Sequence, residues 1–183
     1  MIYDLPTTLE IGGVTQPIRS DYRAALDLCA VLTDPELSQE DRIEALLLIF
    51  YPEWKSIELK DYQEAVEKCL WFLNCGNEDQ GQKAPKLMDW EQDFQMIVAP
   101  INRVMGREIR EPTPLHWWTF ISAYYEIGDC LFAQVVRIRD KKAKGKPLDK
   151  ADKEWYKQNR HLVDLKTTYT QAEQDLLAQF SKK

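Results

Sequence analysis

The side chains with the most obvious chemical potential in this sequence are its two histidines and four cysteines. His116 and His161 have no cysteine or carboxylate at the spacing that a zinc site requires. The cysteines form no C-x-x-C pair, and Cys29, Cys69 and Cys130 lie among apolar residues with helical spacing. These features favour buried free thiols in a reducing compartment over a disulfide framework or a metal site.

The sequence also lacks the short motifs of the common enzyme classes. It contains no G-x-x-x-x-G-K-[ST], no G-x-G-x-x-G and no G-x-S-x-G, so the usual nucleotide-binding and hydrolase signatures are missing. Neighbouring carboxylates such as Glu91 and Asp93 are typical of a solvated helix face in a chain with 30 acidic residues. We therefore expect no catalytic residue, no cofactor site and no metal ligand, and a protein that is not an enzyme.

The charge of the chain is unevenly distributed. Lys and Arg number 24 against 30 Asp and Glu, which gives a net charge of −6. Residues 1–136 carry 11 basic and 23 acidic side chains, a net −12, whereas residues 137–183 carry 13 and 7, a net +6. A basic C-terminal region on an acidic body suggests either an anionic partner or a self-complementary assembly.

The basic side chains of this region are concentrated between residues 137 and 150. That segment has three interpretations: a nucleic-acid contact, a solvated loop, or a docking site for an acidic protein surface. It has no interleaved aromatic residues for reading bases, and the acidic body would repel a polyanion, so nucleic acid is the least favoured. Trp54, in the polar sequence PEWK, is the tryptophan expected to be most exposed. The candidate partner-binding residues are Trp54, Arg137, Arg139, Lys141, Lys142, Lys144 and Lys146.

The elements expected to position these residues are mainly helices. A β-hairpin is predicted at about residues 7–18, where Gly12-Gly13 separates two alternating segments. Helical periodicity then predicts a multi-helix bundle in a single domain over residues 1–183, with a mobile loop at about 74–87 and the basic C-terminal region at 137–183. The predicted helices lie near residues 21–34, 38–51, 59–74, 88–105, 115–127, 130–142 and from 150, with a last one from about 170.

The N-terminus carries no basic stretch followed by an apolar one, and the longest apolar run, residues 45–51, is too short to span a membrane. We therefore expect a soluble protein that stays in the cytoplasm of the cell that makes it and has no membrane partner.

Several segments resemble one family of proteins. They are HWWTF at residues 116–120, KGKPLDK at 144–150, EWYK at 154–157 and the N-terminal pattern D-L-P-T-x-L-E-I-x-G. Together they make residues 4–165 similar to small tail-morphogenesis proteins of long-tailed phages and prophages of Gram-positive bacteria. The resemblance carries no catalytic residues.

The resemblance implies a tail assembly chaperone, because members are encoded near the gene for the tape-measure protein. Such a protein would act in the host bacterial cytoplasm and bind the tape-measure protein or other tail proteins. Association of the protein with itself is a further alternative. A tape measure is a long helical, partly apolar chain that would aggregate before the tail polymerises. The alternatives are a structural component retained in the virion and, third, a nucleic-acid-binding accessory protein.

Overall fold

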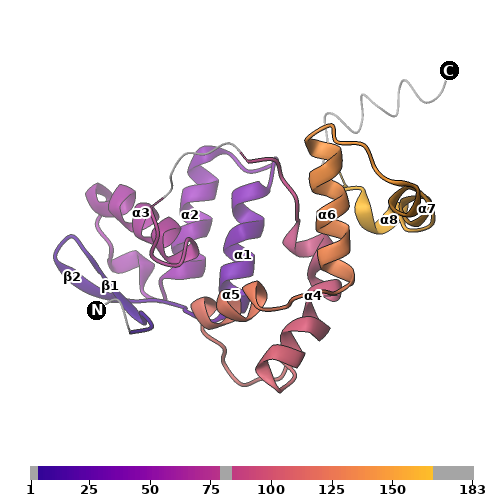
Figure 1. Cartoon of the computed structure of the whole chain (residues 1–183). Coiled ribbons are helices and arrows are strands. Elements are labelled where there is room, and N and C mark those ends of the chain that lie inside the picture. The colour runs from indigo at the N-terminus through magenta and orange to yellow at the C-terminus, as the bar shows by residue number, and fades with distance from the viewer. Residues whose placement is uncertain (1–3, 79–83, 167–183) are drawn as a thin grey trace. The chain divides into compact units, whose positions relative to one another are not determined.

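The computed structural model describes residues 4–78 and 84–166. Within these ranges the chain has eight α-helices and one two-stranded antiparallel hairpin, which confirms the predicted mainly α fold with a small N-terminal β-hairpin (Figure 1). The described residues form two compact units, one ending at Asn77 and the other running from Glu78 to Lys166. That residues 1–183 form a single domain stays a prediction.

The hairpin of the first unit follows from its glycine pair. Strand β1 (Thr8–Ile11) pairs with β2 (Val14–Pro17), and a two-residue turn joins them. Gly12 and Gly13 have φ of +55° and +77°, the left-handed region that a side chain disfavours. The backbone N–H of Gly12 donates to the Glu64 carboxylate at 2.9 Å, so the turn is anchored on a helix. The predicted hairpin is confirmed.

Three helices form the body of the first unit. Asp21 and Ser38 cap the first two through their side chains, as the sequence predicts. The third helix begins later than its predicted start at Leu59, because residues 59–61 form a short 3-10 turn. The elements are α1 (Tyr22–Thr33), α2 (Gln39–Phe50), η1 (Trp54–Ser56), η2 (Leu59–Asp61) and α3 (Tyr62–Leu73).

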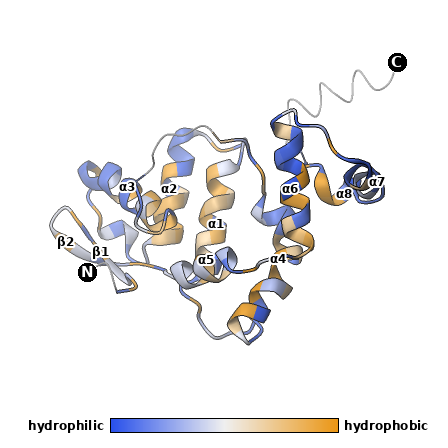
Figure 2. Cartoon of the chain, in the orientation of Figure 1, coloured by the Kyte–Doolittle hydropathy of each residue, from blue (hydrophilic) through white to orange (hydrophobic). Residues whose placement is uncertain are grey.

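The core of this unit lies where α2 packs against α1 and α3. α2 buries Leu46, Leu47 and Phe50, and α1 buries Tyr22, Ala25 and Leu28. Leu26 and Cys29 of α1 are half-buried. The Tyr51 hydroxyl donates to the Ala65 carbonyl at 2.8 Å within this core. Much of the apolar colour in Figure 2 lies on α1 and α2. The buried residues named here are Tyr22, Ala25, Leu28, Leu46, Leu47, Phe50, Tyr51 and Ala65.

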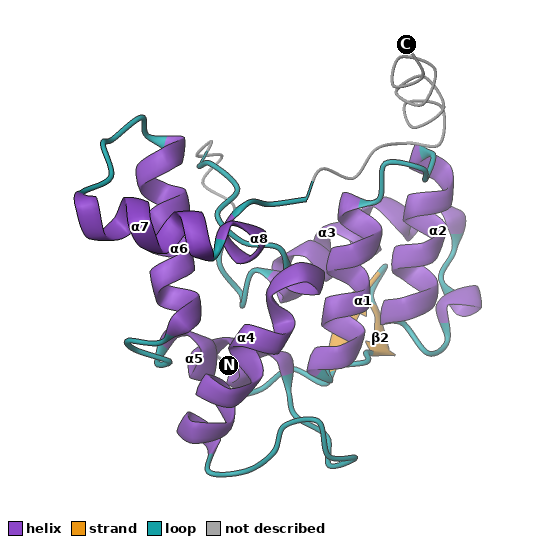
Figure 3. Cartoon of the chain, turned by 90° about the vertical axis from the view of Figure 1, so that its right-hand side faces the viewer, coloured by secondary structure: helices purple, strands orange, loops and turns teal. Residues whose placement is uncertain are grey.

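The second unit contains the other five helices, drawn in Figure 3. Pro100 lies inside the first of them, and the helix continues past it without a break. His116 caps the next helix, because its Nδ1 accepts from the Trp118 N–H at 3.1 Å. The elements are α4 (Trp90–Met105), α5 (Trp117–Tyr125), α6 (Leu131–Ala143), α7 (Lys150–Gln158) and α8 (Arg160–Val163).

Two groups of apolar side chains hold this unit together. Aromatic rings of α4, α5 and α6 pack in a series in which the Trp90 ring lies 5.3 Å from that of Tyr124. A second cluster, formed by Val135, Ile138 and Val163, joins α6 to α8, and the half-buried Trp155 of α7 packs against it. α6 therefore contributes to both groups, and Arg137, Lys141 and Lys142 lie on its more exposed faces.

Two predicted features fall wholly or partly outside the described residues. The helix expected from about residue 170 lies outside them, and so does the middle of the loop expected at about 74–87. Residues 84–89, between that gap and α4, have no regular secondary structure. Among the helices that the structure describes, none has the length and apolarity needed to cross a bilayer.

Candidate partner-binding surface

The predicted basic residues lie at the C-terminal half of α6 and in the bend before α7, but most of them are already paired. The carboxylate of Asp152, on α7, accepts from Arg137 at 2.8 Å and from Lys141 at 2.5 Å. Asp152 is buried, and its hydrogen bond is the main cause that raises the pKa of Lys141. Lys144 pairs with Asp140 at 2.6 Å. Much of the local positive charge is thus neutralised inside the unit.

Lys142 belongs to a second internal network. Its ammonium donates to Asp164 and to the Tyr156 hydroxyl, each at 2.6 Å, and lies 4.1 Å from the centre of the Tyr156 ring. Arg160 donates to the same Asp164 carboxylate at 2.8 Å. Burial raises the pKa of Asp164, but the hydrogen bonds from Lys142, Arg160 and Tyr156 outweigh it and lower the pKa to about 2. Lys142 therefore ties α6 to the end of α8.

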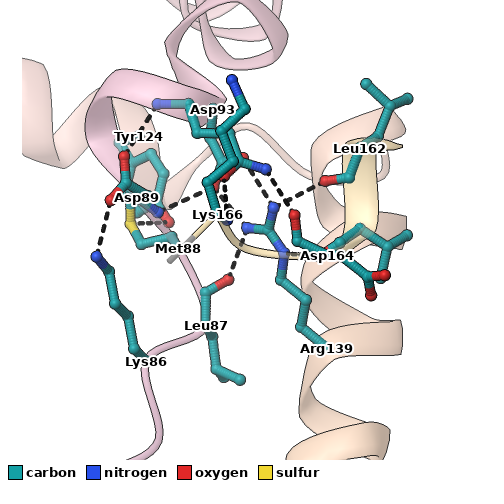
Figure 4. A network of polar contacts seen from close by, with 12 residues as sticks. Lys86, Leu87, Met88, Asp89, Asp93, Tyr124, Arg139, Leu162, Asp164 and Lys166 are labelled. Carbon is teal, nitrogen blue, oxygen red and sulfur yellow. Dashed lines mark hydrogen bonds and ion pairs between the residues drawn. The ribbon is translucent and has the colours of Figure 1, made fainter. Parts of the chain in front are cut away.

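Arg139 does not lie on the surface at all. Its side chain is 4% exposed and forms a two-pronged pair with Asp93 of α4, with N–O distances of 2.5 and 3.0 Å (Figure 4). The same guanidinium donates to the carbonyls of Leu87, Leu162 and Val163 at 3.0, 2.8 and 2.7 Å. This corrects the expectation that Arg139 is a partner-binding residue: it joins α4, α6, α8 and the segment that enters α4.

The sequence did contain a signal for this buried pair. Arg139 follows the buried Phe132 and Val135 at seven and four residues, so it occupies an inward position of α6. Asp93 likewise precedes the buried Ile97 by four residues and Ile101 by eight. When two helices each carry one charged residue on the apolar stripe, and the two charges are opposite, the pattern indicates a buried ion pair. Counting basic residues along the chain instead groups Arg139 with its exposed neighbours.

Two of the candidate partner-binding residues, Lys146 and Trp54, are not part of these internal ion-pair networks. Lys146 is exposed, and its side chain forms no ion pair with any described residue. Trp54, the tryptophan expected to be most exposed, lies in η1 of the first unit, where it is half-buried, with the Lys55 ammonium 5.8 Å from the centre of its ring. Trp54 belongs to the first unit, and the candidate basic residues belong to the second.

A shallow apolar hollow lies where α5 ends and α6 begins. Gly128 turns the chain there with φ +60°, and Arg103 donates to the Ile127 carbonyl beside it at 2.5 Å. Tyr125, at the end of α5, is 77% exposed. The hollow has a volume of about 330 Å³ and is lined by Tyr124, Tyr125, Ile127, Phe132, Ala133, Val136 and Arg137.

This hollow could be predicted from the sequence only in part. The aromatic density of residues 115–127 indicates a helix that buries most of its aromatic side chains and leaves some exposed for a partner. α5 buries Trp117 and Phe120 and leaves Tyr125 exposed. Which aromatic side chain is exposed depends on where the helix ends, and Tyr125 is its last residue. Arg137 is the one residue that belongs both to the predicted basic set and to the lining of the hollow. Within the described ranges, no three His, Cys, Asp or Glu side chains gather in a way that could hold a metal ion.

The chain thus belongs structurally to the mainly helical proteins, with an open apolar hollow beside an ion-paired basic helix as its candidate site. The family model described as Bacteriophage Gp15 protein matches residues 1–165. The chain therefore belongs to the Bacteriophage Gp15 protein family. No curated protein and no solved structure matches it.

Proposed function

We propose that this protein is a non-enzymatic phage tail assembly factor that binds helical segments of the tape-measure protein in the host cytoplasm before the tail polymerises. The observation that carries the proposal is the apolar hollow between α5 and α6. Membership of a bacteriophage protein family supports the phage setting, and the sequence resemblance to tail-morphogenesis proteins supports the choice of client.

The hollow suits a helical client for reasons of shape and chemistry. Its lining is mostly apolar and aromatic and includes one charged side chain, that of Arg137, and it is open to solvent. An amphipathic helix binds such a surface by placing apolar side chains at helical spacing into it. Exposed tyrosines are favoured anchors at protein interfaces because they bury a large area with few rotatable bonds. Tyr125 is the exposed aromatic side chain at this site.

Arg137 is the charged side chain in the lining of the hollow. The Arg137 side chain is 56% exposed although it pairs with the buried Asp152. The ion pair therefore holds the side chain in place while it remains accessible to solvent. A client helix with a carboxylate beside its apolar stripe would place that group next to the remaining N–H donors of Arg137. The proposed client is therefore an amphipathic helix with an acidic flank.

Co-expression with tape-measure fragments tests the proposal. The wild-type chain is expected to keep the fragments soluble and to retain them in a pull-down, and Tyr125→Asp is expected to lower retention at least tenfold. Leu59→Asp is the matched control, because Leu59 is 80% exposed and belongs to the other unit. Failure of the wild type to retain any fragment, or equal retention by Tyr125→Asp, would contradict the proposal.

A structural role in the finished tail is the alternative that a second measurement separates. An assembly factor is expected to be absent from purified virions or present in trace amounts. Mass spectrometry of particles measures this, and a copy number comparable to that of the tail proteins would overturn the assembly-factor function in favour of a retained component.

A further inference from the structure

The outer face of α7 carries a row of lysines that the internal ion pairs leave unused. Lys150, Lys153 and Lys157 are exposed and lie at helical spacings of three and four residues, so they share one face. Asp152, Trp155 and other buried or half-buried side chains occupy the opposite face. None of the ion pairs among the described residues includes these three lysines.

The first unit carries a shorter exposed acidic face. On α2, Glu40, Asp41 and Glu44 are exposed and share a face, and Leu48 continues it at 52% exposure. The buried side of α2, with Leu47 and its neighbours, faces the core instead. At 1.5 Å per residue the lysine row spans roughly 10 Å and the acidic row roughly 6 Å, a difference that the long lysine side chains cover.

We propose that the lysine face of α7 in one copy of the chain binds the acidic face of α2 in a second copy. Both faces are exposed helix surfaces of opposite charge, which is the arrangement that steers and registers two proteins. The interaction joins different surfaces of identical chains, so it forms a ring, a pair of reciprocal contacts or an open series. It uses none of the residues that line the hollow and goes beyond client binding.

A second copy fits the lysine face better than a nucleic acid does. Glu154 lies on the exposed side of α7, one turn from Lys150, and would repel a phosphate backbone. The net charge of −6 adds to that repulsion. In a contact between helices, by contrast, Glu154 can lie at the edge while the three lysines meet carboxylates.

Sedimentation equilibrium of the full chain tests the proposal. Exposed ion pairs are individually weak, so the dissociation constant for self-association is expected to be micromolar to millimolar at 50 mM NaCl. At 500 mM NaCl this constant is expected to rise at least tenfold, because salt screens the charges. Lys150→Glu/Lys153→Glu/Lys157→Glu and Glu40→Lys/Glu44→Lys are each expected to sediment as monomers. An equimolar mixture of the two variants is expected to associate again, because each reversed face then meets its complement.

The matched control is Lys55→Glu/Lys60→Glu/Lys166→Glu, which makes the same charge change at exposed lysines outside α7 and is expected to associate as the wild type does. Circular dichroism verifies that every variant is folded. A wild-type chain that stays monomeric at millimolar concentration overturns the proposal, and so does a mixture that fails to associate. Salt-sensitive binding of duplex DNA by the monomer, lost in the α7 variant, would assign the face to phosphate instead.

Discussion

The buried pair of Arg139 and Asp93 makes a quantitative prediction about the stability of the second unit. Arg139→Met keeps most of the apolar stem but removes the guanidinium, and with it two hydrogen bonds to Asp93 and three to backbone carbonyls. Among the described residues, the Asp93 carboxylate, which is 0% exposed, then keeps only the N–H of Asp89 at 3.0 Å as a donor. Breaking a buried pair in this way costs about 3–5 kcal/mol.

The comparison with Arg137 shows that burial sets this magnitude. Arg137 also pairs with an aspartate, but it is 56% exposed and Asp152 retains Lys141 when Arg137 is removed. Arg137→Met is therefore expected to cost less than about 1 kcal/mol. The double variant Arg139→Met/Asp93→Leu, which removes both charges from the core, is expected to be more stable than Arg139→Met alone.

Hydrogen exchange of the α4 and α6 amides measures the effect in the unit concerned. A loss of 3–5 kcal/mol corresponds to a rise of about two to three and a half powers of ten in the opening equilibrium. The same amides are expected to change by less than about one power of ten in Arg137→Met. Equal and small effects for Arg139→Met and Arg137→Met would refute the conclusion that the Arg139 pair holds the unit together.

Three further predictions concern other parts of the chain. Gly12→Ala is expected to destabilise the chain more than Gly13→Ala in urea unfolding, because a Cβ at Gly12 would lie 2.5 Å from a carboxylate oxygen of Asp61 whereas one at Gly13 meets nothing within 4 Å; equal losses would contradict this. The pKa of Asp164, lowered to about 2 from 3.8, means that its stabilisation is present above pH 3.8 and is lost as the pH falls toward 2. Asp164→Asn is therefore expected to reduce the change of the urea unfolding midpoint with pH over that range. The same pH dependence in the variant and the wild type would count against the network. Burial raises the pKa of Cys69 to about 12, so iodoacetamide at pH 8 is expected to label Cys69 in the folded chain at least a hundredfold more slowly than in urea, and equal rates would be inconsistent with its burial.

The parts of the fold that the sequence predicts well are those decided by neighbouring residues. Gly12-Gly13 between two alternating segments is sufficient for the hairpin, and Ser38 and Asp149 mark helix starts because a cap acts over three residues. Helical spacing also predicts that Leu46, Leu47 and Phe50 face inward. Each of these features is set within one or two turns of chain.

The site depends on residues far apart in the sequence, and for that reason it was predicted less well. Arg139 and Asp93 are 46 residues apart, so a local count of charge assigns Arg139 to a basic surface that it does not join. The pairing of Arg137 and Lys141 with Asp152 likewise depends on how α7 folds back on α6. Exposure of Tyr125 depends on the turn after α5, and aromatic content alone does not distinguish it from its buried neighbours.

The proposal that the hollow binds a tape-measure helix is tested most directly by measuring the affinity of the purified full chain for fluorescently labelled tape-measure fragments. Anisotropy titrations would compare the wild type with Tyr125→Asp and Leu59→Asp. We expect binding by the wild type and by Leu59→Asp with equal dissociation constants, and at least a tenfold weaker one for Tyr125→Asp. No saturable binding by the wild type, or the same dissociation constant for all three proteins, would contradict the account.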